Sequence, residues 1–162
     1  MPTESKKTTK KIAKKSKSMV EMKVVGVTTP EKKDGGRPVL WLKCKNRRMF
    51  LSIAIGPFEA NAICMELYNE PPPRPITYDL MRSILDGLKI RVNQVRIHNW
   101  IEGTFYAEIA LSQGKQKLVV DSRASDGIAL ALRVGAPIFS ADEILEKIGV
   151  KEVVKKATKK RS

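Results

Sequence analysis

Cysteine and histidine are scarce in this sequence of 162 residues, which contains two cysteines and one histidine. Neither Cys44 nor Cys64 lies in a CxxC or a Cys/His group, and a structural zinc site needs about four such ligands. The sequence therefore excludes a usual zinc site, and we interpret both cysteines as buried thiols in a reducing compartment. The single His98 leaves no obvious Ser/His/Asp or Cys/His triad, and its strand pattern favours a solvent-facing side chain.

Long apolar runs and the common nucleotide-binding motifs are also absent. No apolar run of about 18 residues occurs, and residues 1–18 lack the apolar core of a secretory signal. The chain has no GxGxxG, P-loop or GxSxG motif, which excludes the most familiar enzyme classes. We expect a cytoplasmic protein whose length allows one hydrophobic core without disulfides or structural metal.

Positive charge is concentrated at the two ends of the chain. The net charge is +14, from 31 Lys and Arg against 17 Asp and Glu. Residues 1–18 contain seven Lys and one Glu, and residues 151–162 contain five Lys, one Arg and one Glu. Both ends have few large apolar side chains, so we expect a disordered arm over 1–18, a folded domain over 19–150 and a basic tail over 151–162.

The basic residues of these ends are candidates for contact with nucleic acid. Lysines that neutralise phosphates release counterions and give affinity without sequence preference. A membrane-surface helix would need large apolar residues, and Ile12 is alone in its arm, so we expect DNA and RNA as partners and no membrane. The alternative is that the ends only increase solubility. The predicted nucleic-acid-binding residues are Lys6, Lys7, Lys10, Lys11, Lys14, Lys15, Lys17, Lys155, Lys156, Lys159, Lys160 and Arg161.

Alternating and β-branched segments predict six strands in two groups of three. The groups cover 19–28, 38–46 and 47–55, and then 90–100, 103–112 and 115–122. Helical spacing predicts two helices between the groups, over 57–68 and 77–89, and two after them, over 125–135 and 140–149. The order βββααβββαα predicts a single α+β domain with a mixed, largely antiparallel sheet and helices packed on it.

Hydroxyl and acidic residues gather where the predicted helices begin. One interpretation is structural: Thr77, Ser125 and Ser140 are N-caps, and Asp79 and Asp126 are favourable charges in first helical turns. This interpretation accounts less well for Asp121 and Arg123 in the polar stretch 121–126, because neither residue lies within the predicted helix.

Asp121 and Arg123 suggest a second, chemical interpretation. Three carboxylates, of Asp79, Asp121 and Asp126, would hold Mg²⁺ or Mn²⁺, which are cations that prefer hard oxygen ligands. The cation would polarise a phosphodiester while Arg123 binds its nonbridging oxygens. The structural and chemical interpretations both remain open at this point.

Four stretches, IGPFEANAI, PRPITYDL, GTFYAEIAL and DSRASDGIALALRVGAPI, together resemble the bacterial and plant bifunctional nuclease family. The resemblance covers about residues 19–148 and implies an α+β body, often self-associated, that degrades both DNA and RNA. The recurring polar positions of that family fall on Glu59, Arg74, Thr77, Asp79, Asp121, Arg123, Ser125, Asp126 and Arg133. These positions lie at the same helix junctions.

The sequence departs from the family pattern at Tyr78, where the family usually has histidine between threonine and aspartate. A phenol with a pKa near 10 is mostly protonated at neutral pH and is a poor general base. A second departure is Asn99-Trp100, where relatives commonly have Asp-Leu, so one carboxylate is missing. The resemblance therefore implies a nuclease whose activity depends on how the site works with tyrosine.

We expect a nuclease that hydrolyses DNA and RNA with little sequence preference, assisted by Mg²⁺ or Mn²⁺. The predicted catalytic residues are Asp79, Asp121, Arg123, Ser125 and Asp126, with Asp79, Asp121 and Asp126 as metal ligands and Glu59, Arg74, Thr77, Tyr78 and Arg133 as secondary candidates. The main alternative is a non-catalytic nucleic-acid-binding or regulatory scaffold of the same fold. A weaker one is a domain that binds a small anionic metabolite at its helix N-termini.

Overall fold

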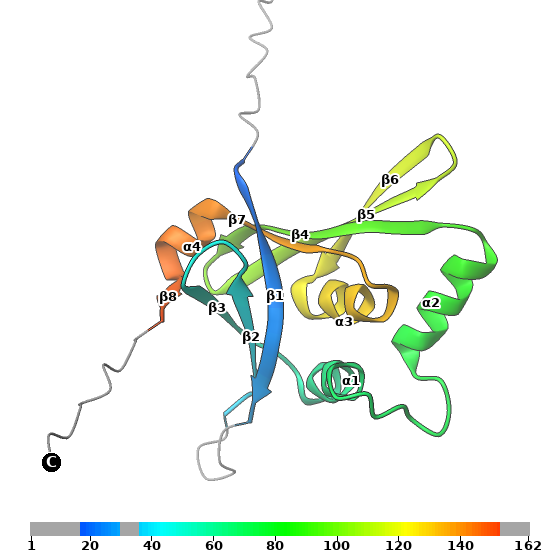
Figure 1. Cartoon of the computed structure of the whole chain (residues 1–162), viewed down its shortest axis with the longest axis horizontal. Helices are drawn as coiled ribbons and strands as arrows, with labels where there is room; N and C mark the ends of the chain where they lie inside the picture. Colours follow the sequence, from blue (N-terminus) through cyan, green and yellow to red (C-terminus); the bar gives the residue numbers. More distant parts are fainter. Residues whose placement is uncertain (1–16, 30–35, 153–162) are drawn as a thin grey trace, which may run out of the picture.

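The computed structural model describes residues 17–29 and 36–152. Most of the N-terminal arm and nearly all of the C-terminal tail lie outside the described residues, together with the predictions made for them. The described part forms one mixed α+β body of an eight-stranded sheet and four helices (Figure 1). The predicted α+β class is therefore confirmed.

The sheet is antiparallel at every pairing except one. Its spatial order is β6-β5-β4-β7-β1-β2-β3-β8, and only β4 and β7 run parallel. The strands are β1 (Met19–Thr28), β2 (Val39–Cys44), β3 (Met49–Ala54), β4 (Arg91–Ile101), β5 (Thr104–Gln113), β6 (Gln116–Arg123), β7 (Ile138–Ala141) and β8 (Val150–Lys151). The six predicted strands correspond to β1 to β6, whereas β7 and β8 were not predicted.

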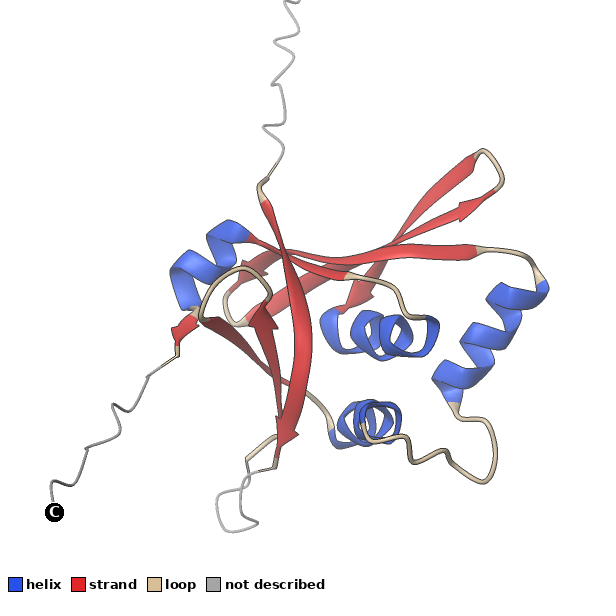
Figure 2. Ribbon diagram, viewed as in Figure 1, coloured by secondary structure: helices blue, strands red, loops and turns tan. Residues whose placement is uncertain are grey.

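Four helices accompany this sheet, three in contact with its strands and one packed on another helix. They are α1 (Pro57–Leu67), α2 (Thr77–Gly87), α3 (Ala124–Val134) and α4 (Asp142–Ile148). Figure 2 shows α1, α2 and α3 grouped below the long strands, with α4 separate at the other end of the sheet. Among the described residues, none of these helices is both long and apolar enough to span a membrane.

The core forms because the strands, whose side chains alternate between two faces, and the helices, whose faces repeat about every 3.6 residues, turn apolar side chains toward one another. Strands β2 and β3 alternate, which places Leu40, Leu42 and Leu51 on one face, where they are fully buried. Helix α3 is buried along most of its length, and its small residues allow a close approach to the sheet. A Cβ added to Gly127 would lie 2.8 Å from Val95 Cγ1 of β4, so glycine is required for this packing. Helix α3 is thus the central element that positions its neighbours.

The predicted N-caps are wrong at all three helices. Helix α2 begins at Thr77, so the extended residue before it, Ile76, is the N-cap. The Ile76 N–H donates to the Asp79 carboxylate at 2.9 Å. Strand β6 continues directly into α3, so Arg123 occupies the N-cap position and Ser125 is a buried helical residue.

The third correction concerns the segment predicted as a helix over 140–149. Residues 138–141 form β7, which is inserted between β1 and β4, and α4 begins only at Asp142. Ser140 is therefore a fully buried strand residue and makes no capping contact with α4. A strand of four residues is stabilised by its two long neighbours, and such partners cannot be seen in local periodicity.

Candidate functional site

Four polar side chains from three helix N-termini converge in one place. Glu59 lies in the first turn of α1, Tyr78 in the first turn of α2 and Asp126 in the first turn of α3. Arg123 ends β6 and immediately precedes α3. The packing of α1 and α2 on α3 brings these positions together, although up to 67 residues separate them along the chain.

Arg123 is the centre of the cluster. Its Nε donates to Asp126 Oδ2 at 2.6 Å, and its Nη2 donates to Asp126 Oδ1 at 3.0 Å and to Glu59 Oε1 at 2.9 Å. Tyr78 Oη donates to Asp126 Oδ1 at 2.6 Å. Within the described residues, Nη1 of Arg123 has no hydrogen-bond partner. One guanidinium is therefore fixed by two carboxylates and keeps donors for a further anion.

A pocket of about 440 Å³ opens beside this cluster. Polar groups line one side, and the apolar side chains of Ile76 and Met81 contribute to another. Phe58 lies at the edge and is 86% exposed. An aromatic ring next to an arginine is an arrangement that suits an unpaired base with its phosphate.

The environment of Tyr78 keeps its hydroxyl protonated. Burial of the ring is the largest influence and raises the pKa of the phenol, and the hydrogen bond to Asp126 raises it further. The phenol is consequently a donor that orients the Asp126 carboxylate. It cannot replace a histidine base at neutral pH, in agreement with the expectation from the sequence.

A second ion pair is formed by Arg133 of α3 and Asp79 of α2. Arg133 Nε donates to Asp79 Oδ1 at 2.7 Å, while Nη1 donates to Ala129 O at 3.0 Å and Nη2 to Ala62 O at 3.1 Å. Its guanidinium carbon also lies 5.3 Å from the centre of the Tyr78 ring. This one side chain links α1, α2 and α3, which indicates a structural role.

The Asp79 carboxylate is held in its ionised form. Desolvation by itself would raise its pKa, but the Ile76 N–H and the Arg133 guanidinium outweigh that effect and lower the pKa below its ordinary value. Both of its oxygens have protein partners, since Oδ2 accepts from Ile76 and Oδ1 from Arg133. Asp79 is therefore a poorly available ligand for a cation.

The position of Asp121 follows from the alternation of side chains along β6. A Cβ on Gly127 would contact Ser122 Oγ at 3.4 Å, so Ser122 faces α3, and alternation along β6 directs Asp121 to the opposite face. There it lies in register with Glu108, whose carboxylate forms an ion pair with Arg96. Asp121 and Asp126 both line a groove of about 500 Å³. The described residues nevertheless contain no group in which Asp79, Asp121 and Asp126 are arranged together to hold a metal ion.

The cation predicted from the sequence does not fit the described residues of one chain. Residues 17–29 and 36–152 contain no group of three or more His, Cys, Asp or Glu side chains arranged to hold a metal ion. The Asp126 oxygens are already occupied by Arg123 and Tyr78. A site built from Asp79, Asp121 and Asp126 would require side chains to move from their present partners.

The remaining predicted residues are distributed around the pocket. Thr77 lines it, and exposed Arg74 lies in the proline-rich connector before α2. Ser125 lines a smaller neighbouring cavity of about 280 Å³ beside Phe105. Lys17 is the one predicted arm residue in the described part, and it donates to His98 O at 3.1 Å and pairs with Glu143. The other eleven basic residues of the arms lie outside the described residues.

Phe58 was missed by the sequence analysis, which treated it only as part of a helical pattern. A signal was present, because Ala60 and Ile63 define the buried face of α1 and Phe58 is displaced from that face. A large aromatic residue at an exposed position in a first helical turn can indicate a binding surface.

Comparison with known proteins gives the family. The chain matches the bifunctional nuclease domain over residues 40–153. Uncharacterized proteins from Mycobacterium tuberculosis strains CDC 1551 and H37Rv are each 39% identical over 132 residues, covering 82% of this chain and 77% of theirs. The matched region contains β2 except for its first residue, β3 to β8, all four helices and every member of the Arg123 cluster. The chain therefore belongs to the bifunctional nuclease domain family.

Proposed function

We propose that this domain hydrolyses phosphodiester bonds in DNA and RNA, with little sequence preference, at the pocket beside Arg123. The observation that carries the proposal is the Arg123 guanidinium, which two carboxylates hold at the pocket while its Nη1 is left for an incoming anion. Family membership supports a nuclease-related function. The low sequence preference follows from the chemistry, because contacts to phosphate carry no base information.

Each group of the cluster has a distinct role in this proposal. Arg123 binds nonbridging phosphate oxygens and stabilises the charge that develops on them in the transition state. Asp126 or Glu59 accepts the proton of the attacking water as its oxygen bonds to phosphorus, the bond from phosphorus to the leaving nucleotide oxygen breaks, and solvent water protonates that oxygen. Tyr78 holds Asp126 in place by donating to it. Phe58 stacks on a neighbouring base. The site therefore acts by positioning and by fixed charges around the scissile phosphate.

Assistance by Mg²⁺ or Mn²⁺ remains a prediction in this scheme. The donors of the described residues do not form a ready cation site, so no step above depends on the cation. The basic residues of 1–18 and 151–162 would add salt-dependent affinity for the nucleic acid without choosing a sequence.

A second candidate function is nucleic-acid binding without cleavage, and a different surface favours it. On the sheet face opposite the core, Lys43 of β2 lies over the Phe50 ring of β3 at 5.4 Å, with Trp41 two residues before it. The Lys43 Nζ also lies 3.5 Å from Oε1 of Glu152, which is the last described residue before the lysines of the tail. Aromatic rings interleaved with lysines are typical of surfaces that bind single strands.

The decisive experiment is cleavage of labelled single-stranded RNA and of plasmid DNA by the full chain. We compare the parent chain with Asp126→Asn, and with Asp86→Asn as a matched control on an exposed part of α2. Reactions are run with Mg²⁺, with Mn²⁺ and with a chelator. We expect the rate to fall at least about 100-fold in Asp126→Asn and to be unchanged in the control, because Asp126 contacts Arg123 and Asp86 pairs with Arg82 instead.

Three outcomes are informative. Equal cleavage by Asp126→Asn and the parent would contradict the assignment of the pocket. Absence of cleavage by the folded parent chain under all three conditions would contradict the nuclease proposal. If oligonucleotide binding were then retained by the parent and weakened by Phe50→Ala, the binding function would take its place.

A further inference from the structure

Arg123 also lines a second, smaller cavity, which shares no other side chain with the pocket described above. This cavity has a volume of about 280 Å³ and lies where the end of β3, the turn between β4 and β5 and the start of α3 meet. Arg37, which precedes β2, also lines it, and we call it the Arg37 cavity. The two cavities therefore adjoin at one arginine.

The two cavities differ in charge. The pocket places two carboxylates beside Arg123. The Arg37 cavity has two arginines, Arg37 and Arg123, and two hydroxyl side chains, Thr104 and Ser125, and none of the described residues that line it is an Asp or a Glu. Two arginines around a cavity without carboxylates are suited to bind a phosphate group.

Ser125 adds a buried hydroxyl to the Arg37 cavity. The residue is only 7% exposed, and its Oγ has no hydrogen-bond partner among the described residues, unlike the hydroxyls of Ser122 and Ser140. Burying a hydroxyl without a partner costs free energy, so such a group usually finds a partner in solvent or in a ligand. Because Ser125 lines the cavity, its hydroxyl is placed to donate to an anion there.

The first turn of α3 adds backbone donors beside Ser125. Arg123 occupies the N-cap position without a side-chain capping bond, and within the described residues no backbone N–H of this turn donates to a side chain. The first N–H groups of a helix have no partner inside the helix, and they carry the positive end of its dipole. Asp126 turns its carboxylate toward Arg123 and Tyr78 instead. The start of α3 therefore favours an anion in the cavity.

The backbone around Arg37 is fixed by two contacts. The Ile55 N–H donates to Pro38 O at 2.9 Å, and Val39 pairs with Ala54 where β2 and β3 meet. Arg37 itself is exposed and forms no ion pair with the described residues. The start of its side chain is therefore held beside the cavity, and its guanidinium is available for a ligand.

We propose that the Arg37 cavity binds a second phosphate of the nucleic-acid strand, adjacent to the phosphate that is hydrolysed in the pocket. Arg37 and Ser125 donate to its nonbridging oxygens. Since Arg123 lines both cavities, two successive phosphates of one strand lie on either side of its guanidinium. The cavity has no carboxylate among the described residues to accept a proton from water, so this second phosphate is bound and not cleaved.

This second site rests on the proposed nuclease function and gives Arg37 a positioning role. Two phosphates at fixed places set which bond of the strand lies in the pocket, independently of the base sequence. The second phosphate keeps its charge during the reaction, so its contacts are equally strong in the ground state and in the transition state. Such uniform binding lowers KM and leaves kcat unchanged. An internal phosphodiester and a terminal phosphate present the same nonbridging oxygens, so both are ligands of this class.

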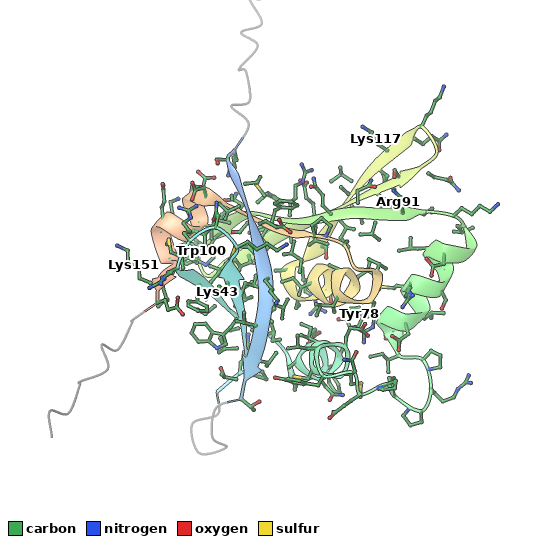
Figure 3. All side chains as sticks on the ribbon, in the orientation of Figure 1. Lys43, Tyr78, Arg91, Trp100, Lys117 and Lys151 are labelled. Carbon is green, nitrogen blue, oxygen red and sulfur yellow. The ribbon has the colours of Figure 1, made fainter. Side chains whose placement is uncertain are left out.

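Cleavage of short RNA substrates by the full chain tests the second phosphate site. The substrates are a dinucleoside monophosphate, which has one phosphodiester, the same dinucleotide with a phosphate on its 5′ or its 3′ end, and a trinucleoside diphosphate. Arg37→Ala is compared with the parent and with Arg91→Ala, which removes an exposed charge on β4. Figure 3 shows that Arg91 lies apart from Tyr78 and hence from the pocket.

We expect Arg37→Ala to raise KM about tenfold, with kcat unchanged, for the trinucleoside diphosphate and for one of the two phosphorylated dinucleotides. KM for the dinucleoside monophosphate should not change, because that substrate has no second phosphate. The phosphorylated end that responds gives the direction of the strand. Arg37→Lys should keep most of the affinity, since an ammonium also binds phosphate, and Arg91→Ala should match the parent with every substrate.

A second variant tests the buried hydroxyl. Ser125→Ala should raise KM about threefold for the same substrates without lowering the unfolding temperature, because the lost hydroxyl has no partner among the described residues. A rise of KM in Arg37→Ala that is equal for all four substrates, or a rise for none of those with a second phosphate, would overturn the second site while the nuclease proposal stands. If the parent cleaves none of the substrates, the nuclease proposal fails, and the dissociation constants of the same labelled substrates decide on the second site by the same comparison.

Discussion

Two arginines at opposite ends of α3, Arg123 and Arg133, both form ion pairs with carboxylates. One of these arginines is exposed to solvent and the other is buried. The Arg133 side chain is 2% exposed and holds Asp79, whereas the Arg123 side chain is 68% exposed and holds Asp126 and Glu59. Arg133 uses its remaining donors on the carbonyl groups of Ala62 and Ala129. Arg123 keeps Nη1 for a ligand. The buried pair therefore stabilises the fold, and the exposed pair is available for chemistry.

This difference divides the recurring polar positions of the family into two groups. Asp79 and Arg133 join the three helices that build the pocket, and each nitrogen of the Arg133 guanidinium and each oxygen of the Asp79 carboxylate already has a partner in the protein. Glu59, Arg123 and Asp126 lie on the pocket itself. Tyr78 connects the groups, because its ring contacts Arg133 and its hydroxyl donates to Asp126. Substitutions in each group should therefore affect different measurements.

The largest effect is expected from breaking the buried pair. Arg133→Ala leaves the Asp79 carboxylate without its partner and the Ala62 carbonyl without its donor, which should cost about 3–5 kcal/mol of unfolding free energy. Urea denaturation followed by circular dichroism measures this loss. Arg82→Ala, which removes an exposed ion pair with Asp86, is the control and should cost less than about 0.5 kcal/mol. Similar losses in the two variants would contradict the structural role of Arg133.

The exposed arginine should show the reverse behaviour. Arg123→Ala should change the unfolding free energy by less than about 1 kcal/mol, because exposed ion pairs contribute little. The rate of RNA and DNA cleavage should fall about 10²- to 10³-fold, since the group that stabilises the charge on phosphate is lost. Arg91→Ala, at the exposed start of β4, serves as the control for the loss of one positive charge. An unchanged cleavage rate in Arg123→Ala would remove this residue from the site.

Tyr78→Phe tests the connection between the two pairs. The ring, and with it the contact to Arg133, is retained, but the donor to Asp126 is lost, so we expect a cost of about 0.5–1.5 kcal/mol in stability. Cleavage should decrease moderately, about tenfold, because Asp126 is still held by Arg123. Rates measured from pH 6 to 9 should have the same profile in both chains, since the raised pKa keeps the phenol protonated throughout this range. A rate increase that depends on Tyr78 above pH 8 would show that the phenol acts as a base.

The sequence allowed the prediction of the fold class and of six strands, because their signals are local. Alternation identified β1 to β6, and the spacing after Pro57 and Thr77 identified α1 and α2. The inserted strand β7 could not be predicted, since its stability comes from β1 and β4, which are distant in sequence. The Ser125 N-cap was wrong for a related reason, because β6 continues into α3 without a loop residue.

The candidate site was predictable as a set of residues but not as a geometry. The sequence placed Asp121 and Asp126 at one junction because they are five positions apart. Alternation along β6 directs Asp121 to the face opposite Ser122, whereas Glu59 and Arg123 form an ion pair although they are 64 positions apart in the sequence. Sequence proximity was therefore misleading for Asp121. The difference between Arg123 and Arg133 depends on burial, which the sequence around the two residues does not reveal.

The smallest expected effect is a pH dependence that belongs to the buried pair alone. The native Asp79 carboxyl has a pKa below its ordinary value of 3.8, because the Ile76 N–H and Arg133 outweigh desolvation. Its contribution to stability is therefore fully present above the pKa of the unfolded chain and is lost as the pH falls through the lower native pKa. We expect the difference in unfolding free energy between the parent and Asp79→Asn to be constant from pH 7 to about 5 and to shrink below about pH 4. Urea denaturation at a series of pH values measures this difference, with Asp86→Asn as the control on the exposed part of the same helix. A difference that stayed constant down to pH 3 would mean that Asp79 and Arg133 are not coupled in the native state, and the contrast between the two arginines would then rest on burial alone.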